Sequence, residues 1–220
     1  MGSFSTAVFL GALLAYLIGT PLSKGIQAIV AYRLGDRLPR SEGRMTFKLS
    51  RQVEPLGLLL ALFLSLGIGV ATWGKPLNLN PFANRLKRLG STVIALSGVL
   101  TYIVLGVVVG LILKAVVNPA NVSNVFINTA FAFVYFSFLL AAFNVIPIPP
   151  LDGYNLWKGL FPASWDVKLV WLETYGAVIL LVLTLFIPFF IRINLLFQFV
   201  FNPIVQLLLN LIGLGSQPVI

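Results

Sequence analysis

Long apolar runs alternate with short polar and basic segments along most of the chain. The longer runs reach the roughly 20 residues that a helix needs to cross a bilayer. The predicted membrane segments are Phe4–Ala31, Leu56–Trp73, Arg88–Val117, Val122–Val145, Lys168–Phe190 and Asn194–Leu214. The pattern therefore predicts an all-α integral membrane protein with four to six membrane segments, forming one domain over residues 1–220.

Small or polar residues recur every four positions in the first apolar run, at Gly11, Ala15, Gly19, Ser23 and Gln27. Residues four apart lie on one face of a helix. Small residues on such a face allow a second helix to approach closely. The row therefore predicts a helix–helix contact face that becomes polar near its end.

Two short segments alternate with a period of two. In residues 43–50, GRMTFKLS, apolar and polar side chains alternate. A shorter alternation follows in residues 76–80. A period of two is typical of a β-strand with one apolar face. We therefore expect a small β element at the membrane surface.

The segment Leu56–Trp73 has only 18 residues and is flanked by basic loops on both sides. A single crossing would place one of these loops outside, against the positive-inside tendency. The charges favour a re-entrant or hairpin segment, and a single span is the alternative.

The composition agrees with a lipid environment, with 59% hydrophobic and 10% charged residues and a mean hydropathy of +0.99. The net charge of +9 would suggest nucleic acid in a soluble protein. Here the basic residues cluster between apolar runs, where they orient the chain and meet anionic headgroups. We expect lipid and no nucleic acid as a partner, in an integral membrane protein of a bacterial plasma membrane or a derived internal membrane.

Neither histidine nor cysteine occurs in the chain. An ordinary zinc site, haem ligation and iron–sulfur ligation all depend on these side chains. We therefore expect no metal cofactor. The sequence leaves open whether a lipid or another apolar ligand, such as a quinone or a carotenoid, is bound.

Four landmarks resemble the site-2 protease family of intramembrane zinc metalloproteases. FNVIPIPPLDG, residues 143–153, is similar to its N-x-x-P-x-x-P-L-D-G signature. AYRLGD, GRMTFKLSRQVEPLG and WGKPLNLNP resemble further segments of that family in the same order. The resemblance covers residues 10 to 210 approximately and implies a site-2 protease-like core.

The zinc-binding residues of that family are replaced in this chain. An H-E-x-x-H motif precedes the equivalent of AYRLGD in the family, where two histidines bind zinc and the glutamate acts as the general base. Ser23, Lys24 and Gln27 stand at these positions, and Asp152 keeps the position of the third zinc ligand. One carboxylate beside a lysine is a poor zinc site, so the resemblance implies a catalytically defective member with no catalytic residues.

The resemblance also places Asp152 close to Lys24. An ionised side chain inside a membrane is costly unless it is paired. We expect Lys24 to pair with Asp152, with Ser23 and Gln27 completing a polar network. The alternative is that Lys24 extends to the headgroups.

The same resemblance implies a groove for a substrate or client, formed by Tyr102, Asn144, Pro147, Pro149 and Asp152. Tyr102 replaces an asparagine of the family, and Asn144 has the alternative role of bracing the broken helix end.

These features predict a structural or assembly subunit in a hetero-oligomeric membrane complex, with the replaced site facing the cytosol. One alternative is a pseudoprotease that holds a client transmembrane segment without cleaving it. The others are a residual intramembrane metalloprotease and ion conduction through Lys24 and Asp152.

Overall fold

The computed structural model describes residues 5–68, 72–80, 82–116, 125–187, 190 and 197–215. The longer helices are α1 (Thr6–Arg33), α4 (Pro55–Ser65), α5 (Arg88–Val116), α6 (Val125–Phe143), α7 (Asp152–Leu160), α8 (Asp166–Leu181) and α10 (Asn202–Leu211). The short ones are α2 (Leu38–Ser41), α3 (Leu49–Gln52), a 3-10 turn (Ala163–Trp165) and two π-helical turns (Val182–Phe186 and Phe197–Phe201). Four helical stretches are long and apolar enough to cross a bilayer: Thr6–Arg33, Arg88–Val116, Val125–Phe143 and Ala163–Phe186. The all-helical integral membrane architecture and the lower limit of four predicted segments are thus supported.

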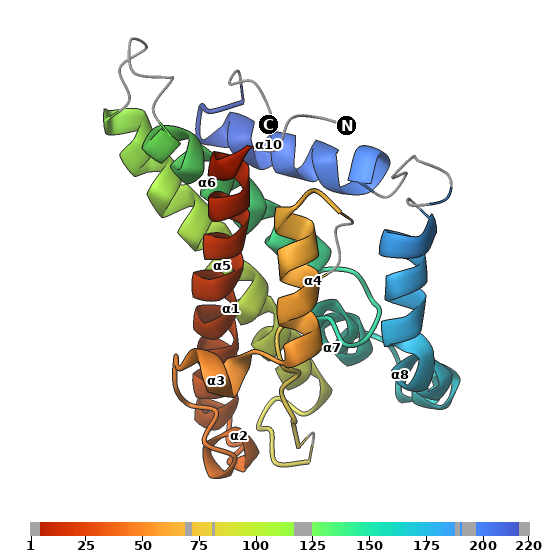
Figure 1. The fold of residues 1–220 in the computed structure, drawn as a ribbon. Coiled ribbons are helices and arrows are strands. Elements are labelled where there is room, and N and C mark those ends of the chain that lie inside the picture. Colours follow the sequence, from red (N-terminus) through yellow and green to blue (C-terminus); the bar gives the residue numbers. More distant parts are fainter. Residues whose placement is uncertain are drawn as a thin grey trace.

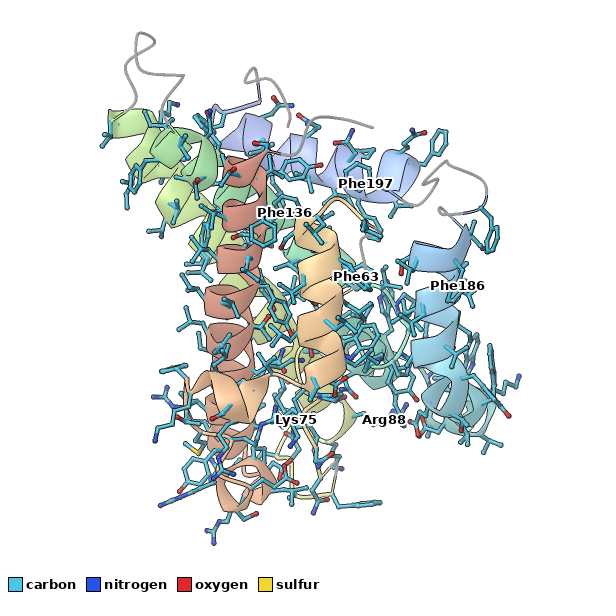
Figure 2. The ribbon with its side chains drawn as sticks, viewed as in Figure 1. Phe63, Lys75, Arg88, Phe136, Phe186 and Phe197 are labelled. Carbon is cyan, nitrogen blue, oxygen red and sulfur yellow. The ribbon has the colours of Figure 1, made fainter. Side chains whose placement is uncertain are left out.

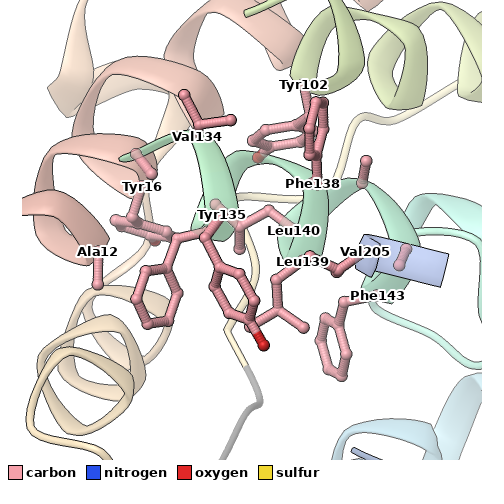
Figure 3. Packing of buried hydrophobic residues seen from close by; sticks show 14 of the residues in the cluster. Ala12, Tyr16, Tyr102, Val134, Tyr135, Phe138, Leu139, Leu140, Phe143 and Val205 are labelled. Carbon is pink, nitrogen blue, oxygen red and sulfur yellow. The ribbon is translucent and has the colours of Figure 1, made fainter. Parts of the chain in front are cut away.

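The core is formed where α1 and α5 pack on α6 (Figure 1). Most of α6 is buried, and Figure 3 shows its Phe138 and Leu140 among side chains of the neighbouring helices. The predicted small-residue face of α1 is confirmed, since a Cβ added at Gly11 would lie 2.3 Å from Ala132 Cβ on α6. A Cβ at Gly19 would lie 2.7 Å from the Tyr102 ring on α5.

The segment after α3 is a hairpin, as the charges predicted. Helix α4 has 11 residues and is about 16 Å long, which is too short to cross a hydrocarbon core of about 30 Å. Thr72 Oγ1 donates to Gly57 O at 2.8 Å, so the chain has returned to the start of α4 by residue 72. Trp73 O accepts from Tyr16 Oη of α1 at 2.9 Å, which holds the returning limb on the core.

The expected surface β element is not present, because none of the residues that the structure describes forms a strand. Side chains of Arg44 and Gln52, together with one backbone bond from Lys75 N to Gln52 O at 2.8 Å, make the cross-links instead of a backbone ladder. Arg44 donates to Lys75 O at 2.8 Å and to Pro76 O at 3.1 Å. Gln52 Nε2 donates to Arg44 O at 2.7 Å and to Thr46 O at 2.6 Å. Arg44 is buried, whereas Phe47 is half exposed and packs against Gly25 of α1, where an added Cβ would lie 2.6 Å from its ring.

Arg44→Lys is expected to lower the free energy of unfolding by about 1–3 kcal/mol, because one ammonium cannot replace a buried guanidinium that reaches three acceptors. Arg44 also donates to Gln52 Oε1 at 3.0 Å. Burial lowers the pKa of Arg44, and the charge of Glu42 partly opposes this. Denaturant unfolding in detergent measures the change, with Arg51→Lys at an exposed position as the control. Equal losses in both variants would contradict the assigned role of Arg44.

The two C-terminal elements lie at the edge of the bundle. Figure 1 shows α10 lying across the end of the bundle opposite α2. Helix α8 contacts the core through few residues, among them Gly176, where an added Cβ would lie 2.5 Å from Pro149 O. Lys75 and Arg88 lie at the end of the bundle opposite α10, and Figure 2 shows them far from Phe136 and Phe197.

Candidate functional site

The predicted polar network is built where α1, α5 and the start of α7 meet. Ser23, Lys24 and Gln27 lie on one buried face of α1. Helix α7 begins at Asp152, directly after the proline-containing turn. A Cβ at Gly153 would lie 2.2 Å from Ile146 O, so a glycine lets the first turn of α7 pack closely against the preceding backbone. This packing points Asp152 toward α1.

Lys24 and Asp152 form a buried ion pair. Lys24 Nζ donates to Asp152 Oδ1, and Gln27 Nε2 donates to Asp152 Oδ2 at 2.6 Å. The two charged residues are 2% and 5% exposed, respectively. The predicted pairing is confirmed, and the alternative in which Lys24 extends to the headgroups is wrong. Both carboxylate oxygens have a donor, as a buried charge requires.

Helix α5 completes the site with its backbone and one tyrosine. Ser23 Oγ donates to Gly98 O at 3.1 Å. This bond links α1 to α5, and its acceptor is the backbone of α5 and not Asp152. A Cβ at Gly98 would lie 1.8 Å from Gln27 Nε2. Tyr102 Oη and Thr20 Oγ1 are 3.0 Å apart and share a hydrogen bond. Sequence reasoning missed Gly98 and Thr20, although each lies four residues from a predicted site residue on the same helix.

The returning limb of the α4 hairpin covers the ion pair. A Cβ at Gly74 would lie 2.4 Å from Thr20 Cγ2 and 3.2 Å from Lys24 Cε. The same Cβ would lie 3.1 Å from Gln52 O. The backbone at Gly74 therefore packs against the aliphatic stem of Lys24 and closes that side of the site.

The predicted groove residues differ in their exposure and contacts. Tyr102, Asn144 and Asp152 are buried, and Asn144 Nδ2 donates to Leu140 O at 2.8 Å, which braces the end of α6. Pro147 is exposed, and Pro149 lies against Gly176 of α8. Tyr102 contacts Thr20 on the α1 face that carries Lys24.

Ser23, Lys24, Gln27 and Asp152 do not fit a zinc ion. Zinc in proteins is held by several cysteine, histidine or carboxylate side chains. Asp152 supplies one carboxylate, whose two oxygens accept from Lys24 and Gln27. No group of three such ligand residues occurs among the residues that the structure describes. The positive charge of Lys24 lies where a divalent cation would need negative ligands.

Comparison with known proteins finds a distant similarity to a protein named as a zinc metalloprotease. The chain is 27% identical over 162 residues to the Bacillus subtilis protein named "Putative zinc metalloprotease YwhC", covering 71% of each chain. A further match, 44% identical over 50 residues, is to "Uncharacterized protein MJ0971" of Methanocaldococcus jannaschii, covering 23% of this chain and 13% of that protein. No family model and no solved structure matches the chain. The first similarity agrees with the resemblance to a site-2 protease-like family.

Proposed function

We propose that this protein is a non-catalytic relative of intramembrane metalloproteases that serves as a structural or assembly subunit of a larger membrane complex. The observation that carries the proposal is the ion pair at the replaced zinc positions. Lys24 and Gln27 donate to both oxygens of Asp152, so a metal at this carboxylate would have to compete with an ammonium and an amide. No residue at this site offers the general base that a metalloprotease needs.

The exposed surface of α8 supports a subunit role. Trp171, Tyr175 and Val178 are all more than half exposed on a membrane-spanning helix. Tyr175 is about 18 Å along the span from its start at Ala163, near the middle of a bilayer. Its hydroxyl makes no hydrogen bond with the described residues. A hydroxyl at this depth is stabilised by a polar group on a neighbouring protein helix, which lipid tails do not offer.

The client-holding alternative has less support. Asn144 and Tyr102 are the side chains that would hold a client in the implied groove. Both are buried and hydrogen bonded within the chain, to Leu140 O and Thr20 Oγ1. A bound client segment would have to break these bonds first.

Purification from native membranes in a mild detergent tests both halves of the proposal on one sample. We expect elemental analysis to find zinc at well below one ion per chain. We also expect the chain to migrate in a complex larger than itself, with at least one partner polypeptide at fixed stoichiometry. A photoactivatable residue at position 175 should crosslink to that partner, and one at the exposed α5 position Val104 serves as the matched control.

Two results would overturn the proposal. One is stoichiometric zinc together with peptide cleavage that is lost in Asp152→Asn. The other is a lone monomer in every native preparation, with no difference between crosslinking at positions 175 and 104. The first would revive the residual metalloprotease, and the second would remove the subunit role.

A further inference from the structure

An apolar cavity of about 570 Å³ lies between α5, α6, α7 and the C-terminal helix. All its lining side chains are apolar, and they include Val99, Ile103, Ala142, Trp157, Phe161 and Ile204. The one polar atom of the Trp157 side chain is already used, because Nε1 donates to Val145 O at 2.9 Å. The cavity therefore presents hydrocarbon and aromatic surface with no free polar side chain.

The cavity is separate from the ion-pair site. Both sites use α5, but Gly98 and Tyr102 face α1, whereas Val99 and Ile103 line the cavity. Successive helix residues are rotated by about 100°, so these two pairs lie on different faces of α5. Neither Lys24 nor Asp152 lines the cavity. A ligand can occupy it without touching the ion pair.

We propose that this cavity binds the acyl chain of an anionic bilayer phospholipid. Its volume lies in the range of about 300–1,000 Å³ that is usual for ligand sites. A flexible hydrocarbon chain fits both the size and the apolar lining.

The end of the cavity at α7 has the features of a headgroup site. The ring of Phe161, which lines the cavity, is stacked on Trp165 with centroids 5.0 Å apart. Lys168 Nζ lies 5.7 Å from the centroid of the Trp165 ring. Arg88 donates to Phe161 O at 3.0 Å and pairs with Asp166. Aromatic rings mark the level of the membrane interface, and lysine side chains there attract anionic headgroups.

Lys168 is a cation available to a lipid phosphate. Arg88 and Lys158 are neutralised by ion pairs with Asp166 and Glu173. Lys168 forms no ion pair within the described part of the chain and is held against the aromatic stack. The acyl chain would then run from the Phe161 end toward Ile204 on α10. This site goes beyond the proposed function and does not depend on the loss of zinc.

Photolabelling in nanodiscs tests the site, with a phosphatidylglycerol that carries a diazirine on its acyl chain as the probe. We expect peptide mass spectrometry to find the label concentrated in residues 141–147 and 200–208. Ile204→Trp fills the cavity and should lower labelling of residues 141–147 by about threefold or more. Leu207→Trp introduces the same ring at an exposed position of α10 that does not line the cavity, and should leave labelling unchanged.

Lys168→Gln tests the contribution of the lipid headgroup separately from that of the acyl chain. It should lower labelling by the phosphatidylglycerol probe and leave labelling by the matching phosphatidylcholine probe unchanged. Ala142→Val, a smaller filling change, gives a second test if Ile204→Trp does not fold. Label spread evenly over the exposed positions of α5, with no response to either filling variant, would overturn the proposal. So would native preparations in which a crosslinked polypeptide covers residues 141–147.

Discussion

Lys24→Met is expected to lower the free energy of unfolding by about 3–5 kcal/mol, because it leaves the Asp152 carboxylate buried without its cation. Lys24 Nζ and Gln27 Nε2 are the two side-chain donors to that carboxylate, and Gln27 alone would remain. Methionine keeps most of the length of the lysine stem, so the variant removes charge without opening a large cavity. Unfolding monitored in lipid nanodiscs or detergent gives the difference directly.

The double variant Lys24→Met with Asp152→Leu supplies the control for charge. Replacing both members of a buried ion pair by apolar residues of similar size is often neutral or stabilising. We expect the double variant to recover most of the stability that the single change loses. A Lys24→Met protein as stable as the wild type would show that the carboxylate is neutral or solvated, and would contradict the ion pair.

Gly98→Ala is expected to cost about 2–5 kcal/mol of unfolding free energy, from overpacking and from the loss of a charge-assisted hydrogen bond. The added Cβ would lie 1.8 Å from Gln27 Nε2 and 2.8 Å from Ser23 Oγ. Gln27 would have to move, and its bond to Asp152 would break. Unfolding in the same detergent, combined with Gln27→Ala in a double-mutant cycle, should show that the two changes are strongly non-additive.

Gly110→Ala on the same helix is the matched control. Its Cβ would meet the Cδ1 end of the Ile212 side chain at 2.5 Å, and a flexible side chain can move away. Alanine is also favoured over glycine in a helix by about 1 kcal/mol. We expect a small change in either direction. Equal destabilisation by the two alanines would mean that the contact between Gly98 and Gln27 has no special role.

The α4 hairpin and the Lys24–Asp152 pair were predictable from the sequence for physical reasons. Basic residues on both sides of Leu56–Trp73 do not suit a single crossing. A lysine deep in an apolar helix needs a partner, and Asp152 follows the turn that the family resemblance places beside it. The charges, which are few in this chain, therefore define much of the topology and the centre of the site.

The surface segment and the α5 side of the site were not predictable in the same way. The alternation in residues 43–50 has the period of a strand, yet Arg44 turns inward to carbonyl groups of Lys75 and Pro76. Those acceptors are distant in the sequence, and local periodicity has no information about them. The contact between Gly98 and Gln27 likewise depends on how closely two helices approach, which residue patterns do not fix.

The buried pair also constrains the order in which the protein is made. Lys24 and Asp152 are separated by 128 positions in the chain. At about 5–20 residues per second, synthesis takes about 6–26 seconds to produce the aspartate after the lysine. During this interval the first span holds an unpaired ammonium, at a cost of about 2.5–3.5 kcal/mol in a membrane. We therefore expect α1 to be more shallowly inserted in a nascent chain stalled before residue 152 than in the finished protein.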